Sequence, residues 1–312
     1  MQHSNNKVLT RRTLIKSAAA VCAALHLSPA RLAPMGRDKI NKHIPVSGEP
    51  LALMGVGTSR TFDVQIDALS KTELVAVMQG FFDEGGQCID SSPMYGKAEA
   101  VTGELLRQVT GKDKLFAATK VWTDGQQSGI DQMNASFTKM NVKVMDLMQI
   151  HNLRDWKIHI QTIREWKAQG RIRYTGITTS HGRDHAELAQ ILKSEELDFV
   201  QFTYNIEDRT AEQTLFPIVR DRGIATLINL PFQRGGLFRK VGNRPLPEWA
   251  AEFDCASWGQ FFLKFIGSHP DVTCIIPATT RVKHMLDNMA AGFGRLPDAE
   301  MRKRMIEYMD KI

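Results

Sequence analysis

The chain has 312 residues, of which 43% are hydrophobic and 24% are charged, and its formal net charge at pH 7 is +6. These are ordinary values for a soluble globular protein, and the length suits one large α/β barrel or two smaller domains. The first 30 residues hold four basic residues and no acidic one, so the net charge falls to +2 without them. The remaining charge gives no sign of a nucleic-acid or membrane-surface partner, and neither is expected.

Residues 1–30 have the three parts of an export signal, namely a basic start, an apolar run over residues 17–27 and a small-residue exit ending at Ala30. The run covers about 11 residues, too few to span a ~30 Å hydrocarbon core, so no stable membrane insertion is expected after cleavage. Arg11 and Arg12, followed by Leu14, Ile15 and a lysine, resemble the twin-arginine signal, whose machinery exports folded proteins. We therefore expect a periplasmic protein. An ordinary basic leader or a disordered tail is the alternative.

The cysteines and histidines predict no metal site and no disulfide framework. Beyond the leader, Cys88, Cys255 and Cys274 are odd in number and widely spaced. The histidines between residues 159 and 269 have no spacing typical of metal ligands, and capping or surface roles fit them better.

The chain after the leader predicts a linker followed by alternating strands and helices. Residues 31–50 show no periodicity and are interpreted as a linker. The predicted strands cover residues 51–58, 88–90, 115–120, 144–151, 172–177, 198–204, 224–230 and 272–277. The predicted helices cover residues 72–83, 98–109, 130–140, 155–169, 185–193, 210–222, 256–266, 282–291 and 298–309, with a long loop over 231–254.

Eight strands that each precede a helix indicate a parallel sheet, and eight units is the number that closes a (β/α)8 TIM barrel. We therefore predict one barrel domain over residues 51–312. A doubly wound open sheet is the main alternative. It is disfavoured because no G-x-G-x-x-G follows the first strand and no acidic residue stands at the usual distance beyond it.

Three ionisable residues end successive predicted strands. Asp90 ends the second strand, Lys120 the third and His151 the fourth, at spacings of 30 and 31 residues. Tyr95 lies on the loop after the second strand. Residues at the carboxyl ends of barrel strands converge at the mouth where catalysis takes place. Taken alone, the Asp90 segment would be read as a helix cap with Tyr95 packed above it; the recurrence downstream favours a catalytic set.

These residue types suit proton transfer to a carbonyl group. A tyrosine has a reference pKa near ~10, and a neighbouring ammonium is expected to lower it. A carboxylate paired to the lysine keeps the lysine charged, and a histidine can orient the carbonyl oxygen. The hydride must come from a cofactor, because no side chain supplies one.

Asp90, Tyr95 with Gly96, Lys120 and His151 resemble the aldo-keto reductase family, in its order and spacing, over roughly residues 50–295. The resemblance implies a (β/α)8 barrel and NAD(P)(H)-dependent interconversion of aldehydes or ketones with alcohols. It implies Tyr95 as the general acid, Lys120 and Asp90 as its tuning pair, and His151 as the orienting group. A non-catalytic nucleotide-binding barrel, acting as a redox sensor or partner subunit, is the alternative.

The resemblance also implies residues that contact the nicotinamide. Gly57 and Thr58 match the first-strand turn beside the ring, and Gln201 matches the glutamine that binds its carboxamide. Asn229 stands where many members have a tyrosine that stacks on the ring. This departure makes the cofactor end the place where the chain differs from the family.

Two further segments resemble cofactor-binding loops. Gly176-Ile177-Thr178-Thr179 stands where the family has Gly-Val-Ser-Asn, so Thr178 keeps the hydroxyl and Thr179 replaces the amide. Residues 233–237 can offer backbone N–H groups and the cation Arg234 to the pyrophosphate. A plain mobile loop is the alternative for that segment.

The last segment bears on cofactor choice. It matches the family at Thr279, Asp287 and Asn288. The lysine and arginine that many members use for the 2′-phosphate are replaced by Ala278 and His284, and Arg281 can substitute for them. NADP(H) is therefore preferred and NAD(H) remains possible.

Overall fold

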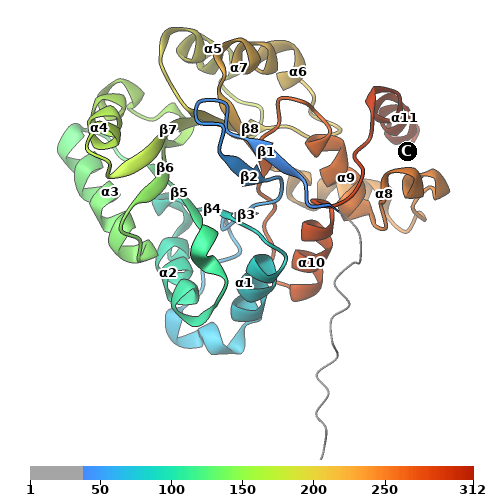
Figure 1. Cartoon of the computed structure of the whole chain (residues 1–312), viewed down its shortest axis with the longest axis horizontal. Coiled ribbons are helices and arrows are strands. Elements are labelled where there is room, and N and C mark those ends of the chain that lie inside the picture. The colour runs from blue at the N-terminus through green and yellow to red at the C-terminus, as the bar shows by residue number, and fades with distance from the viewer. Residues whose placement is uncertain (1–37) are drawn as a thin grey trace, which may run out of the picture. The chain divides into compact units, whose positions relative to one another are not determined.

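The computed structural model describes residues 38–312, which form one compact unit. The predicted signal over residues 1–30 and the start of the predicted linker lie outside the described residues. The described part is a closed ring of parallel strands surrounded by helices (Figure 1). This confirms the prediction of a (β/α)8 TIM barrel.

Eight parallel strands build the ring in sequence order. They are β3 (Val56–Gly57), β4 (Cys88–Asp90), β5 (Phe116–Val121), β6 (Met145–Ile150), β7 (Ile172–Thr178), β8 (Phe199–Thr203), β9 (Ala225–Asn229) and β10 (Cys274–Ile275). A bridge between Met54 and Ile275 closes the ring, and Gly57 N donates to Pro277 O at 3.0 Å. A Cβ on Gly57 would lie 2.9 Å from Ile276 O, so the seam requires a glycine.

The outer helices lie close to the predicted ranges, except that the single helix predicted over residues 210–222 is divided at Leu215 into two. They are α1 (Leu74–Asp83), α2 (Ala98–Gln108), α3 (Gln126–Met140), α4 (Trp156–Ala168), α5 (His185–Ser194), α6 (Ala211–Thr214), α7 (Phe216–Arg222), α9 (Trp258–Gly267), α10 (Val282–Ala290) and α11 (Ala299–Asp310). Two of them begin at side-chain caps, where Ser257 accepts from Gln260 N at 3.0 Å and Asp298 accepts from Met301 N at 2.8 Å. None of the helices between residues 38 and 312 is long and apolar enough to span a bilayer.

The barrel interior is layered, because side chains alternate between the inside and the outside of each strand. The lower layer is apolar and includes Cys88, Ala118 and Leu147. Two residues further along the same strands come Asp90, Lys120 and Gln149, all buried. The register pairs Ala118 with Leu147 and Lys120 with Gln149. Because every second side chain of a strand faces inward, Asp90, Lys120 and Gln149 form one polar layer at the carboxyl end of the ring.

A hairpin closes the opposite end of the barrel. β1 (Asn41–His43) pairs antiparallel with β2 (Pro50–Ala52), and Figure 1 draws the pair in blue across the ring of strands. Ile44 and Leu51 are buried with the lower apolar layer. Tyr174 OH lies 2.7 Å from Glu49 Oε2. The prediction of a linker over residues 31–50 is therefore wrong for its described part. Strands of three residues are too short to give a periodic pattern in the sequence.

The segment over residues 231–254 is also more ordered than the expected loop. It contains α8 (Gly236–Val241) and a 3-10 helix over Glu248–Phe253. Phe238 in α8 packs edge to face on Phe262 of α9, with ring centroids 5.6 Å apart. These short elements were not predicted, because the Pro and Gly residues of the segment are typical of a loop. Their position depends on contacts with α9.

Candidate active site

Asp90 and Lys120 form a buried ion pair at the carboxyl end of the barrel. Lys120 Nζ lies 2.5 Å from Asp90 Oδ2 and 2.7 Å from the carbonyl oxygen of Ser91. Lys120 is fully buried and Asp90 is 2% exposed. Burial lowers the pKa of Lys120, but Asp90 and then Tyr95 outweigh it and leave that pKa raised. Lys120 is therefore a charged ammonium group.

Tyr95 ends a 3-10 turn, Pro93–Tyr95, directly after β4. Lys120 Nζ lies 5.1 Å from the centre of its ring. Burial raises the pKa of Tyr95, and Lys120 only partly opposes that effect. The expected lowering by Lys120 is therefore present but is not the larger contribution. The phenol keeps its proton, which is the state that a general acid needs.

His151 follows β6 and faces Tyr95 edge to face, with ring centroids 5.6 Å apart and planes at 90°. Burial, and then the charge of Lys120, lowers the pKa of His151 to about 2. The imidazole is therefore neutral at any working pH. Its Nδ1 lies 2.9 Å from Ser92 Oγ.

Two glutamines complete the shell around Asp90. Gln149 Nε2 donates to Asp90 Oδ1 at 2.9 Å, and Gln201 Nε2 donates to the same oxygen at 3.1 Å. A Cβ on Gly176 would lie 2.9 Å from Gln149 Cγ, so that glycine leaves room for the glutamine. The sequence does not single out Gln149 as a site residue. A polar residue inside an apolar strand, two positions after the inward-facing Leu147, was the available signal.

Asn229 is engaged by neighbouring polar groups. Its Nδ2 donates to Thr179 O at 2.9 Å and to Gln201 Oε1 at 3.4 Å, and its Oδ1 accepts from Thr203 Oγ1 at 2.6 Å. Through Gln201 these bonds continue to Asp90. A hydrogen-bonded chain thus links Asn229, where the resemblance implies a stacking tyrosine, to Asp90 and Lys120.

A cavity of about 590 Å³ opens above these residues. It runs from Tyr95 and His151 past Gln201 and Asn229 to the loops near residues 234 and 284. Thr61 and Thr179 line it, and each has a buried hydroxyl without a partner among residues 38–312. Such hydroxyls fit the polar groups of a dinucleotide, because a bound molecule would supply their missing partners.

One wall of the cavity is cationic, which fits the pyrophosphate of a dinucleotide. Arg60, Arg183 and Arg234 line it and act together on His181, whose pKa is lowered by burial and then by these charges. Arg60 and Arg183 were missed by the sequence analysis, because they sit on loops after β3 and β7 whose convergence only the folded barrel shows.

The predicted cofactor residues fall into two groups in space. Those that line the cavity are Gly57, Thr58, Thr178, Gln201 and Arg234. Those that do not line it are Thr279, Arg281, Asp287 and Asn288, around the start and body of α10. Arg281 Nη1 is 2.7 Å from Glu73 Oε1, and Asp287 accepts from Ser257 and Gln260, each at 2.7 Å. Their cofactor roles stay predictions.

The four catalytic candidates, with the buried ion pair among them, lie together at the cavity. The model of the aldo/keto reductase family matches residues 53–305. The chain belongs to the aldo/keto reductase family. This confirms the expected oxidoreductase that interconverts carbonyl compounds and alcohols with a nicotinamide cofactor. Between residues 38 and 312, no group of three or more His, Cys, Asp or Glu residues is placed to hold a metal ion.

Two curated relatives from Escherichia coli strain K12 are similar over most of their length. Methylglyoxal reductase YeaE is 28% identical over 268 residues, which is 83% of this chain and 92% of the relative. A protein named NADH-specific methylglyoxal reductase is 26% identical over 287 residues, covering 73% of this chain and 85% of the relative.

Solved structures share the fold. An aldo-keto reductase from Bacillus halodurans in its holo form superposes with a TM-score of 0.70 at 20% identity, covering 87% of this chain and 96% of that one. An aldo/keto reductase from Klebsiella pneumoniae in complex with NADP and acetate gives a TM-score of 0.71 at 20% identity, covering 84% and 93%.

Proposed function

We propose that this enzyme reduces a small aldehyde or ketone, with Tyr95 as the proton donor and NADP(H) as the preferred cofactor. The observation that carries the assignment is the buried Lys120–Asp90 pair beneath a protonated Tyr95, beside a neutral His151. NAD(H) remains an accepted cofactor, because the chain lacks the usual cations at Ala278 and His284.

The residues divide the work of reduction among them. A reduced nicotinamide, which Thr58, Thr178 and Gln201 would hold in the cavity, would supply the hydride. As that hydride joins the carbonyl carbon, the π electron pair moves onto the carbonyl oxygen, and Tyr95 gives its phenolic proton to that oxygen. Lys120 stabilises the phenolate that remains, and Asp90 holds Lys120 charged and in place. His151 orients the carbonyl oxygen.

The substrate class that we propose is a small 2-oxoaldehyde such as methylglyoxal. Both relatives from Escherichia coli described above bear the name methylglyoxal reductase. Tyr95, His151 and Asn152 line the cavity together with Met94, whose side chain is exposed. A compact polar carbonyl compound suits such a mixed wall.

Steady-state assays test this function. Purified enzyme with NADPH or NADH and a panel of aldehydes that includes methylglyoxal should form alcohol in step with oxidation of the cofactor. A higher kcat/KM is expected with NADPH. Binding of NADPH without turnover across the panel would overturn the proposal and favour the nucleotide-binding sensor.

We also propose that the folded enzyme is exported to the periplasm by the twin-arginine machinery with its cofactor already bound. The support is the basic, apolar and small-residue pattern of residues 1–30 with its paired arginines. Free nicotinamide cofactor is expected to be scarce outside the cytoplasm, so a bound cofactor that is regenerated in place would meet the need.

Cell fractionation and native mass spectrometry test the export proposal. The wild-type chain should reach the periplasm carrying cofactor, whereas a variant with Arg11→Lys and Arg12→Lys should stay in the cytoplasm. Export of the lysine variant would contradict the route. Exported protein that is empty and cannot retain added cofactor would contradict export with the cofactor bound.

A further inference from the structure

We propose that Ser92 is a positioning residue that fixes His151 in the neutral tautomer with its proton on Nε2. The effect on catalysis rests on the function proposed above, whereas the tautomer of His151 follows from the local geometry alone. It concerns a serine outside the set of four residues that carries the family resemblance.

Ser92 stands between the strand that ends in Asp90 and the turn that ends in Tyr95. It is fully buried and caps the 3-10 turn Pro93–Tyr95. Its Oγ accepts a hydrogen bond from Met94 N at 3.2 Å and lies 2.9 Å from His151 Nδ1. These are the hydrogen-bond partners of the Ser92 hydroxyl among the described residues.

The number of protons decides the direction of the bond to His151. A hydroxyl has one hydrogen to donate and two lone pairs that accept. Met94 N–H occupies a lone pair, so the hydroxyl hydrogen still needs an acceptor, and Nδ1 is the group within reach. Nδ1 therefore carries no proton. Since His151 is neutral, its proton sits on Nε2.

The opposite tautomer would leave the buried hydroxyl hydrogen of Ser92 without an acceptor. An unsatisfied buried donor of this kind corresponds to a bias of roughly ten- to a hundredfold between the two tautomers. The low pKa of His151 removes the charged form, in which both ring nitrogens would donate.

This tautomer matters for the substrate. Nδ1 and Nε2 lie on different sides of the imidazole ring, so with Nδ1 held by Ser92, Nε2 is the nitrogen left for a ligand in the cavity that His151 lines. An Nε2–H group donates to a carbonyl oxygen together with the hydroxyl of Tyr95. The other tautomer would turn a lone pair toward that oxygen, which disfavours binding and proton transfer.

Ser91, the neighbouring serine, does not have this role. Its hydroxyl accepts from Thr58 Oγ1 at 2.9 Å, and its carbonyl oxygen accepts from Lys120. A matched control comes instead from Ser136 in α3. That serine is also buried, and its hydroxyl donates to the carbonyl oxygen of Gln132 at 3.2 Å, outside the residues that line the cavity.

Nitrogen-15 NMR of the whole chain labelled at histidine tests the tautomer without any turnover. The signal of His151 is assigned with His151→Gln. In the wild type, proton correlations should show Nε2 protonated and Nδ1 bare from pH 5 to 8. In Ser92→Ala the signals should become those of a tautomer mixture. A wild-type His151 protonated on Nδ1, or on both nitrogens, would overturn the proposal.

Kinetics then test the role. Ser92→Ala should lower kcat for carbonyl reduction roughly ten- to a hundredfold with an unchanged Kd for NADPH. Ser136→Ala should leave both unchanged. A wild-type kcat in Ser92→Ala would contradict the positioning role. If the chain reduced no carbonyl compound at all, the NMR result would still decide the tautomer, so the two proposals fail separately.

Discussion

At the scale of single residues, burial has the largest effect on the protonation states of the catalytic candidates Tyr95 and His151. Burial raises the pKa of Tyr95 against the opposing effect of Lys120, so the phenol keeps its proton. Burial and the charge of Lys120 both lower the pKa of His151, so the imidazole is neutral. Burial lowers the pKa of Lys120, and Asp90 is the group that opposes this effect most strongly. The site thus contains the Lys120–Asp90 ion pair, a protonated Tyr95 and a neutral His151.

The pH profile of carbonyl reduction follows from these states. Reduction requires a protonated Tyr95, so kcat/KM should stay level from about pH 5 to about pH 9 and fall only as the phenol ionises, above its reference value of about 10. His151 should add no step near pH 6.5, because its pKa is about 2. A step near pH 6.5 that disappears in His151→Gln would contradict this account.

The spacing of strand ends was enough to predict that Asp90, Lys120 and His151 lie together at one end of the barrel, because a βα unit has a nearly constant length. The direction of the Tyr95 pKa was not predictable, since the sequence shows the neighbouring lysine but not how deeply the phenol is buried. Arg60 and Arg183 were not predicted as cavity residues for a related reason, because their loops converge only in the closed barrel.

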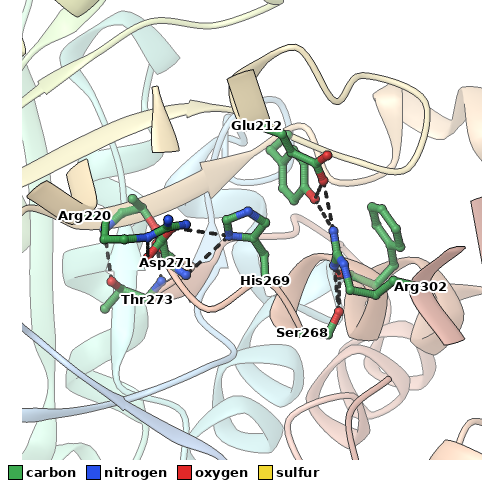
Figure 2. Close-up of polar contacts among 10 residues, drawn as sticks. Glu212, Arg220, Ser268, His269, Asp271, Thr273 and Arg302 are labelled. Carbon is green, nitrogen blue, oxygen red and sulfur yellow. Dashed lines mark hydrogen bonds and ion pairs between the residues drawn. The ribbon is translucent and has the colours of Figure 1, made fainter. Parts of the chain in front are cut away.

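At the scale of elements, the last helix is held to the barrel by Arg302. Figure 2 shows this side chain reaching toward Glu212 and Ser268. It donates to Tyr204 OH at 2.6 Å and to Glu212 Oε1 at 2.9 Å. Its guanidinium carbon lies 4.3 Å from the centre of the Phe265 ring. One arginine thus joins α11 to α9, to α6 and to Tyr204 in the segment before α6.

Replacing Arg302 should loosen this attachment. Arg302→Met should lower the free energy of unfolding by about 2–3 kcal/mol, because it removes the guanidinium that donates to Tyr204, Glu212 and Ser268 in a partly buried setting. Urea unfolding measures the change. Lys303→Met is the matched control and should cost less than about 0.5 kcal/mol, since Lys303 is 80% exposed. Equal losses in the two variants would contradict the role of Arg302.

His269 lies beside the same cluster and makes stability depend on pH. It stacks on Phe216 with centroids 3.8 Å apart, and its Nδ1 accepts from Asp271 N at 3.3 Å. Burial, and then Arg302, lowers its pKa to about 4; Asp271 and Glu212 oppose this and Arg220 adds to it. Figure 2 shows the ring between these groups.

The unfolded chain therefore binds more protons than the folded chain between pH 4 and pH 6.5. Stability should be full above about pH 6.5 and fall by about 1–2 kcal/mol as the pH drops to about 4, after allowance for solvent at the open edge. Unfolding of His269→Gln across this range should show a smaller slope. An unchanged slope would contradict the assignment.

Strands and long helices were predictable from period and length, whereas the β1–β2 hairpin and α8 were not. Ile44 and Leu51 are too few to give a periodic signal, and their burial depends on the open lower end of a barrel built by later residues. Short elements of this kind take their structure from tertiary contacts.

At the scale of the whole molecule, the barrel separates stability from chemistry. The hairpin and the apolar layer fill one end, and the polar layer with its cavity occupies the other. The proton-transfer end carries the four residues on which the family resemblance rests, and the departures that this resemblance implies lie at the cofactor end, at Thr179, Asn229, Ala278 and His284. The link from Asn229 through Gln201 to Asp90 joins the two.

The central claim is that Tyr95 donates the proton during carbonyl reduction, and Tyr95→Phe tests it most directly. Single-turnover reduction by enzyme preloaded with NADPH should slow by roughly 10²–10⁴-fold in Tyr95→Phe, with an unchanged Kd for NADPH. Reduction at the wild-type rate in that variant would contradict the account.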